Sequence, residues 1–505
     1  MRKISYMVFI SILDNRENLQ KEEGIPGFIY DLNLDQVIEQ IQGQSLVPVK
    51  QYFHYLPADK SCEDYRRAVY ADVKRAEVNQ LLTEFMERME ARKQAIERKS
   101  EVGIGMQRAA WMIQEIAAYC EAYTKLYEGL QEATIQSKGL LELRELLKSY
   151  TTSEEYTRMQ KTALDLREKL QSFRVKLVYE QECLVVEEGE VEGSYERFLQ
   201  EILGGHTMQM KSPFGNAPEM NSLEKEIVQR FSKKQPAFFK EMRAFYHEYE
   251  NYENAVLLQF AEEISYYLSY YHFQQSMELK GFVFVTPSVD ESKDMSAQGL
   301  YDLALACDSI RTGKAVIAND MNYCKGESFL VVTGPNQGGK TTFARSLGQL
   351  IYLTKMGLDV PATAANVHSF SGILTHFSVE ESVETGRGKL MEELMRLKPM
   401  MCENYRNAFV IINELFTTAA NYDACIMGKK VLEHFIAQEC RGIYVTHLKE
   451  LTKAHESVVS MRAMVDEQKK QNFKICRYEA DDSVCAINQV NKYRLTYEQL
   501  KERLR

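Results

Sequence analysis

One stretch of the sequence places glycine, lysine and threonine in the order that can bind a triphosphate. Residues 334–341 read GPNQGGKT and fit the pattern G-x-x-x-x-G-K-[ST]. Glycine lets the backbone curl so that successive N–H groups point at an anion. Lys340 could reach the β- and γ-phosphates, and the Thr341 hydroxyl could ligate Mg²⁺. The predicted nucleotide-contacting residues here are Gly334, Pro335, Asn336, Gln337, Gly338, Gly339, Lys340, Thr341 and Thr342.

The flanking residues fit such a loop. Ser328–Thr333 is an apolar run typical of a buried strand, and a helical pattern starts near Lys340. The N-terminal end of that helix would add positive potential at the anion. A chance glycine-rich turn is the alternative, but strand, loop and helix fall where phosphate binding requires them.

A second predicted strand, Phe409–Ile412, ends in Asn413 and Glu414. Many ATPases with this loop carry Asp-Glu there; the Asp holds Mg²⁺ through water, and the Glu orients the attacking water. Glu414 fits the second role. Asn413 lacks the charge for the first, although its amide oxygen can accept from a metal-bound water. We therefore expect Thr341, Asn413 and Glu414 around Mg²⁺, with weakened metal binding or slow hydrolysis. A strand that simply ends in Asn-Glu is the alternative.

Two further segments could reach the same nucleotide. A third predicted strand, Gly442–Val445, is followed by Thr446 and His447, and a histidine there can reach the γ-phosphate or the lytic water. Gly386–Lys389 (GRGK) precedes a predicted helix, Leu390–Leu397, which Pro399 should help to stop. This loop could bind an anion of its own chain or of a second chain. A plain flexible basic loop is equally consistent with the spacing.

Composition limits the class of protein. A chain of 505 residues should form two to four units, and 45% hydrophobic with 27% charged residues indicates a folded, soluble protein. The net charge of −10 means that any nucleic acid must meet a local basic surface. No apolar run approaches the ~18 residues of a membrane span. The ten cysteines form no C-x-x-C pair, so we expect reduced thiols, no zinc site and a cytoplasmic location.

The rest of the chain is mostly helical in pattern. Apolar residues repeat at helical spacing over about 62–170 and 222–279, and 31–38 and 301–306 predict short helices. Residues 173–192 predict a β-hairpin, 204–221 a loop, and 1–15 and 281–285 strands. The second helical block is rich in aromatics, which could stack on exposed bases or, as we expect, pack against a partner helix. From about residue 310 the alternation of strands and helices predicts an α/β nucleotide-binding domain.

Between Gly334 and His447 the sequence resembles the ATPase domain of the MutS family of DNA mismatch-repair proteins. TGPNQGGKTT is similar to that family's TGPNMGGKST, and GLDVPATAANV to its Gly-x-x-Val-Pro-Ala segment. GRGKLMEEL stands where the family has GRSTFMVEM, INELFTTAANYDA where it has MDEIGRGTSTYDG, and VTHLKELT where it has ATHYFELT. The resemblance covers roughly residues 300–500. YFHYLP and YRRAVYADV, farther upstream, are more weakly similar to the family's core and lever helices.

The resemblance implies an ABC-type P-loop ATPase domain at 291–505, a helical core and lever domain with a small β insertion at 61–290, and an N-terminal segment 1–60 of unclear role. It implies a homodimer that closes ATP and Mg²⁺ between subunits while helical arms clamp DNA. Lys340, Glu414 and His447 would be the catalytic residues, with His447 as γ-phosphate sensor. Val316 and Ile317 stand where the family packs its adenine.

The sequence also departs from the family. Because about 50 residues precede the core, we expect no mismatch-reading domain, and we also expect a largely missing connector and no C-terminal nuclease. Gly388 and Lys389 replace the family's Ser-Thr, and Asn413 replaces its Asp. The leading hypothesis is a MutS-like ATPase that clamps mismatched or branched DNA in mismatch repair or recombination. The alternatives are a nucleotide-gated module with little hydrolysis that binds branched DNA, RNA or ribosomes, and a helical scaffold whose ATP only stabilises the dimer.

Overall fold

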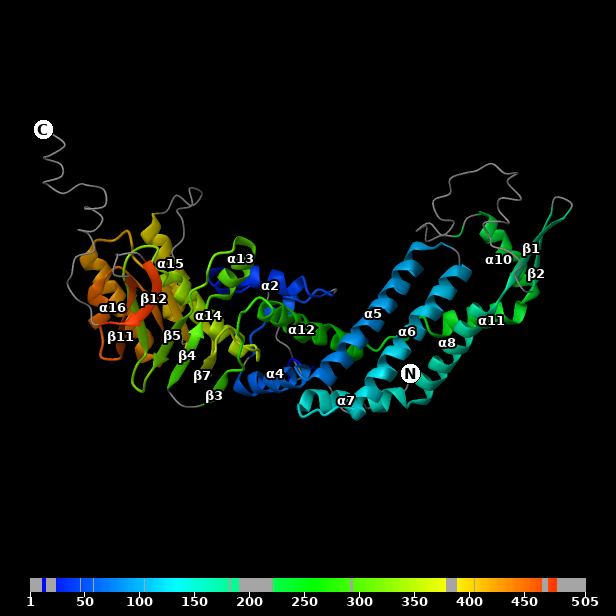
Figure 1. Cartoon of the computed structure of the whole chain (residues 1–505), viewed down its shortest axis with the longest axis horizontal. Coiled ribbons are helices and arrows are strands. Elements are labelled where there is room, and N and C mark those ends of the chain that lie inside the picture. Colours follow the sequence, from blue (N-terminus) through cyan, green and yellow to red (C-terminus); the bar gives the residue numbers. More distant parts are fainter. Residues whose placement is uncertain are drawn as a thin grey trace, which may run out of the picture. The chain divides into compact units, whose positions relative to one another are not determined.

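The computed structural model divides into two compact units (Figure 1). It describes residues 11–14, 24–45, 47–57, 59–103, 105–180, 183–189, 220, 222–290, 294–377, 388–403, 405–465 and 471–478. The first unit comprises Met1–Ile12 and Ala71–Leu268, and the second comprises Leu13–Tyr70 and Ser269–Arg505. These bounds differ from the predicted division at residues 60 and 290, because residues 13–70 cluster with the C-terminal part.

The first unit consists mainly of helices and confirms the predicted helical blocks and β-hairpin. Its helices are α5 (Ala76–Glu101), α6 (Gly105–Glu132), α7 (Lys138–Thr151), α8 (Glu154–Ser172), α10 (Ser222–Lys234) and α11 (Pro236–Glu248). The hairpin pairs β1 (Val175–Glu180) with β2 (Cys183–Glu188) in antiparallel register. The division between the units falls within α4 (Lys60–Val73) and α12 (Ala255–Glu278).

Most aromatic residues of the second helical block are packed inside the protein. Phe238 and Phe239 are 6% exposed, Phe245 is 2% exposed and Phe260 is fully buried. Phe238 and Phe239 meet edge to face with a centroid distance of 5.4 Å. Burial of large aromatic surfaces stabilises helix packing. The structure therefore favours packing over base stacking for these rings.

The second unit contains a six-stranded sheet with the order β12-β11-β6-β10-β9-β8. Its strands are β6 (Phe329–Thr333), β8 (Ile373–Phe377), β9 (Phe409–Asn413), β10 (Arg441–Val445), β11 (Val458–Val465) and β12 (Gln471–Arg477). All neighbours pair in parallel except β11 and β12. Every residue of β6, β9 and β10 is buried, as expected for central parallel strands. The three strands predicted from apolar runs are thus confirmed, and the unit is mixed α/β.

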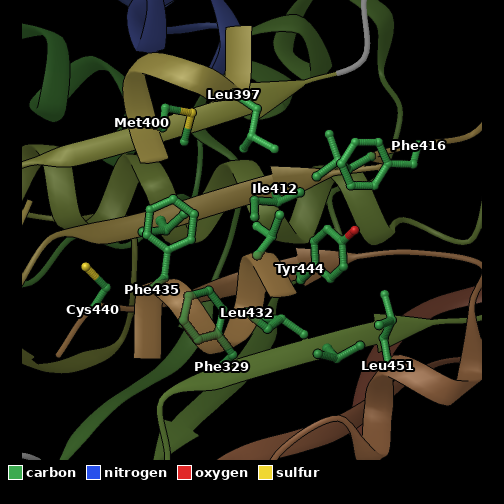
Figure 2. Close-up of a cluster of buried hydrophobic side chains, with 14 of the residues drawn as sticks. Phe329, Leu397, Met400, Ile412, Phe416, Leu432, Phe435, Cys440, Tyr444 and Leu451 are labelled. Atoms are coloured by element: carbon green, nitrogen blue, oxygen red, sulfur yellow. The ribbon is translucent and has the colours of Figure 1, made fainter. Parts of the chain in front are cut away.

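Helices α15 (Lys389–Cys402) and α16 (Asn421–Ala437) contribute to the core of this sheet (Figure 2). Phe329, Ile412 and Tyr444 from the central strands meet Leu397 of α15 and Phe435 of α16 in one hydrophobic cluster. The cluster fixes the strand ends, and so it fixes where the residues that follow each strand must lie.

Residues 24–70 pack around α14 (Lys340–Lys355), the helix that follows the glycine-rich segment. They form α1 (Gly27–Asp31), the predicted α2 (Leu34–Gln42), α3 (Lys50–His54) and most of α4. Arg345 donates to the carbonyl of Asp31 at 3.0 Å, and Tyr352 donates to that of Phe53 at 2.6 Å. Lys355 forms a buried ion pair with Glu63 at 2.5 Å. This N-terminal segment is therefore an integral part of the second unit.

A smaller sheet, with the order β3-β7-β4-β5, completes this unit. Its strands are β3 (Ser288–Asp290), β4 (Met295–Leu300), β5 (Asn319–Tyr323) and β7 (Ala364–His368). The predicted short helix is confirmed as α13 (Leu303–Thr312), which Asp302 caps by accepting from the Leu305 N–H. None of the helices in the described part of the chain combines the length and apolar character that a membrane crossing needs.

Two local predictions are wrong. Gly281–Val285 is not a strand, because only Val285 makes a bridge, to Val360, and β3 begins at Ser288. Pro399 does not stop α15, which continues to Cys402. The missing N–H removes one helical hydrogen bond, while Met400 is buried against the core cluster and holds the last turn in place. The predictions for residues 1–10, 204–219 and 386–387 lie outside the described residues.

Candidate functional site: the glycine-rich loop and its neighbours

The glycine-rich loop, residues 334–339, leads directly from β6 into α14. Gly334 has φ +132° and Gly339 has φ +84°, conformations that other residues rarely adopt. A Cβ on Gly334 would lie 2.9 Å from the Cβ of Ala463 on β11. Glycine is therefore required at 334 both for the backbone conformation and for the close approach of β11.

Lys340, the first residue of α14, folds back onto this loop. Its Nζ donates to the carbonyl of Gly334 at 2.9 Å and to that of Pro335 at 3.0 Å. The residue is only 3% exposed, and burial lowers the pKa of its ammonium group, while the negative charge of Glu414 opposes that shift. An ammonium group held at the mouth of a loop of backbone N–H donors is suited to a phosphate oxygen.

The sheet topology brings the ends of β6, β9 and β10 together. β10 lies between the other two, and its Val445 pairs with Val332 on one side and Asn413 on the other. As a result the Thr341 hydroxyl donates to Oδ1 of Asn413 at 3.0 Å, although 72 residues separate them. Two of the residues predicted for Mg²⁺ thus lie in direct contact.

Glu414 and His447 follow β9 and β10 and face each other. His447 Nε2 lies 3.0 Å from Oε1 of Glu414, and both side chains are partly exposed. The hydrogen bond from His447 lowers the pKa of the Glu414 carboxyl; burial opposes this shift, whereas the charges of His447, Lys340 and Lys389 favour it. A carboxylate kept ionised beside a lysine-lined loop can orient and polarise a water molecule. Because Lys389 acts on Glu414 of the same chain, this residue can influence its own chain's site.

A cavity of about 660 Å³ adjoins the loop. Its wall includes most of the predicted loop residues, from Asn336 to Thr342, together with Glu414 and Ile317. Of the described residues predicted for the site, Val316, Gly334, Pro335, Asn413 and His447 are absent from the wall. Asn413 and His447 adjoin it through Thr341 and Glu414, which they contact. The structure therefore places the predicted residues in one region around one cavity.

Part of the wall comes from residues that sequence reasoning missed. Tyr301, Asp302 and Leu305 line the cavity from the start of α13, and Phe473 lines it from β12. Phe473 is 45% exposed, and its carbonyl accepts from Asn319 Nδ2 at 3.2 Å. Gln471, two residues earlier, donates to the carbonyl of Asn336 at 2.8 Å. β12 is a largely polar strand more than 120 residues from the loop, and neither its composition nor its spacing signals this contact.

The donors available to a cation are hard oxygen atoms. Thr341, Asn413 and Glu414 supply a hydroxyl, an amide oxygen and one carboxylate, which fit Mg²⁺ that is bound mainly through phosphates and water. Within the part of the chain that the structure describes, no group of three or more His, Cys, Asp or Glu side chains could hold a metal ion. The residues therefore fit a metal that arrives with a triphosphate.

The same residues lie in a segment that matches a known family. Residues 330–490 match the family model of MutS domain V. This part of the chain belongs to the MutS family. It is similar to DNA mismatch repair protein MSH6 of Arabidopsis thaliana, with 32% identity over 165 residues, which are 32% of this chain and 12% of that protein. It is also similar to DNA mismatch repair protein MutS of Shouchella clausii, with 22% identity over 41% of this chain and 23% of that protein.

A third similar protein is DNA mismatch repair protein spellchecker 1 of Drosophila melanogaster, with 27% identity over 165 residues, or 32% of this chain and 18% of that protein. The matches thus span between 12% and 23% of these three relatives' length. The predicted resemblance to the MutS family is confirmed for this region.

Proposed function

We propose that this MutS family chain binds ATP with Mg²⁺ at the glycine-rich loop and hydrolyses it to ADP and phosphate. One observation carries the proposal: Lys340, Thr341 and Glu414 line a single cavity, and Thr341 and Glu414 contact Asn413 and His447. Ile317 and Phe473 line the same cavity and would pack against the adenine.

In this proposal each side chain has a separate task. The Lys340 ammonium group releases its hydrogen bonds to the carbonyls of Gly334 and Pro335 and binds oxygens of the β- and γ-phosphates instead. Glu414 orients the attacking water, and His447 holds the carboxylate and meets the γ-phosphate. Thr341 and Asn413 would hold Mg²⁺, which would neutralise charge on the phosphates when bound. The contribution of Glu414 is mainly orientation, since a carboxylate of lowered pKa is a weak base.

We further propose that two copies of the chain associate through their ATPase regions and that their helical units clamp DNA. Met391, Leu394 and Met395 follow helical spacing on α15 and are 54%, 39% and 50% exposed. An exposed apolar stripe of this kind suits a protein partner. The stripe begins two residues after Lys389, so a second copy seated on it would lie close to the site. DNA is the proposed ligand because the relatives are named DNA mismatch repair proteins.

A nucleotide-gated module with little turnover remains the second candidate, and Asn413 favours it. Where many related ATPases have a carboxylate, the Thr341 hydroxyl here meets a neutral amide oxygen at 3.0 Å. With one negative charge fewer beside the metal, Mg²⁺ should bind less tightly and hydrolysis should be slower. Such a protein would respond to ATP binding more than to ATP cleavage.

Fluorescent ATP binding by Lys340→Ala tests the site, with Lys398→Ala, an exposed residue of α15, as control. We expect Lys340→Ala to lose binding and the control to keep it; binding that survives in Lys340→Ala refutes the assignment.

Steady-state phosphate release separates the two candidates: fast release that rises with DNA supports the enzyme, and tight ATP binding with near-zero release supports the module. Binding to mismatched, branched and plain duplexes with and without ATP, at two salt concentrations, tests the DNA proposal.

A further inference from the structure

A second buried carboxylate lies close to Glu414, and sequence reasoning gave it no role. Glu393, on the second turn of α15, is 3% exposed. Its Oε2 accepts a hydrogen bond from the backbone N–H of Phe416 at 3.0 Å. Phe416 stands two residues after Glu414, and its side chain belongs to the same hydrophobic cluster as Leu397 of α15 (Figure 2). Glu393 therefore joins α15 directly to the turn that carries Glu414.

That turn has an unusual backbone. Glu414 has φ +57° and Phe416 has φ +61°, both in the left-handed region that non-glycine residues avoid. Such conformations persist only where the surroundings enforce them. Here the Glu414 N–H donates to the carbonyl of Val445 at 2.9 Å, and the side chains of Leu415 and Phe416 are each 2% exposed in the core cluster. Glu393 supplies a further restraint by binding the Phe416 N–H.

Glu393 is costly for stability at this position. Burial raises the pKa of its carboxyl, and its Oε1 has no hydrogen-bond partner within the described residues. A buried carboxylate with one unpaired oxygen is less favourable than an apolar side chain of similar size. Packing alone therefore does not account for a glutamate here, whereas the bond to the Phe416 N–H does.

We propose that Glu393 is a positioning residue: it fixes the turn after β9 and so aims the Glu414 carboxylate at His447 and the cavity. This inference rests on the proposed ATP hydrolysis. It also means that a displacement of α15, whose first residue is Lys389, would reach the turn of Glu414 through this hydrogen bond.

Two substitutions separate positioning from packing. Glu393→Gln keeps an oxygen that can accept from the Phe416 N–H, and Glu393→Met has a similar length without that acceptor. We expect Glu393→Met to lower kcat on the order of 10- to 100-fold, as small misplacements of catalytic groups do, with KM for ATP within about twofold of wild type. Glu393→Gln should stay within about threefold of wild-type kcat. An unchanged kcat in Glu393→Met overturns the proposal, and so does a Glu393→Gln variant that falls equally far.

Hydrogen exchange at the Phe416 amide gives a readout independent of turnover. It should be faster than wild type in Glu393→Met and near wild type in Glu393→Gln, while Lys398→Ala on the same helix changes neither exchange nor kcat. Equal exchange in Glu393→Met and wild type refutes the hydrogen bond and the proposal with it. A Glu393→Met chain that does not fold makes the residue a structural one and also refutes it. Absence of turnover in the wild-type chain refutes the proposed hydrolysis, and the positioning role falls with it.

Discussion

The buried pair of Lys355 and Glu63 offers the sharpest test of how α14 is held. Lys355 is the last residue of the helix that begins with Lys340. Its Nζ lies 2.5 Å from Glu63 Oε1 and donates to the carbonyl of Phe370 at 2.6 Å. Glu63 Oε2 accepts from the Ser369 hydroxyl at 3.1 Å. The two side chains are 3% and 1% exposed, so loss of either partner leaves a charge that water cannot reach.

We expect Lys355→Met and Glu63→Met each to lower the free energy of unfolding by about 3–5 kcal/mol, the usual cost of breaking a buried pair. With a melting shift of roughly 2–4 °C per kcal/mol, each melting temperature should fall by about 6–20 °C. The double variant should recover most of this loss, because two apolar side chains replace two opposite charges.

Urea and thermal unfolding followed by circular dichroism would measure all three variants and yield the coupling energy of the pair. The control is the exposed pair of Lys429 and Glu433 on α16, which lie 3.7 Å apart; Lys429→Ala should cost less than about 0.5 kcal/mol. Single variants within about 1 kcal/mol of wild type, or a double variant whose loss equals the sum of the single losses, would refute this reasoning.

Three further predictions concern the glycine-rich loop and its neighbours. Asn413→Asp should raise Mg²⁺-dependent phosphate release, since it restores a negative charge beside Thr341; unchanged release at every Mg²⁺ concentration would count against a metal role. His447→Ala should shift the acid limb of the rate–pH profile to higher pH, because the hydrogen bond that lowers the pKa of Glu414 is lost. In the wild-type protein, ionised Glu414 stabilises the fold above its ordinary pKa of 4.5, and this stabilisation is lost as the pH falls through the lower pKa of the folded state. The folded-state pKa should be higher in His447→Ala, so this variant should lose stability at a higher pH than wild type does. Gly334→Ala should abolish ATP binding and lower the melting temperature by several degrees, because φ is +132° and Ala463 is 2.9 Å from the new Cβ; a calorimetric affinity equal to wild type would contradict this.

The central strands and the glycine-rich loop could be predicted because their signals are local. β6, β9 and β10 are short apolar runs, and in a parallel sheet the residues that follow such runs gather at one edge. This reasoning predicted that Lys340, Glu414 and His447 would lie near one another. The same reasoning could not predict the hydrogen bond that Glu393 accepts, because the donor is a backbone N–H whose orientation depends on the turn at Glu414.

Contacts between distant segments were not predictable in the same way. Phe473 and Gln471 reach the cavity and loop from a polar strand at the edge of the sheet. The sequence up to residue 60 gave no sign that its backbone carbonyls accept hydrogen bonds from α14, because carbonyl acceptors are identical in every residue. Pro399 was misread because a local rule for ending helices is outweighed by the packing of the residue that follows it.

The arrangement of residues 24–70 around α14 has a practical consequence for anyone who truncates the gene. A fragment that starts where the resemblance to other proteins starts would leave Arg345, Gln349 and Tyr352 without the backbone carbonyls of Asp31, Leu32 and Phe53. Lys355 would also lose its ion-pair partner, because Glu63 would be missing. An inactive or insoluble C-terminal fragment would therefore say little about the full chain. Both segments of the second unit can be kept if residues 13–70 are co-expressed with residues 269–505, or if a linker joins residue 70 to residue 269.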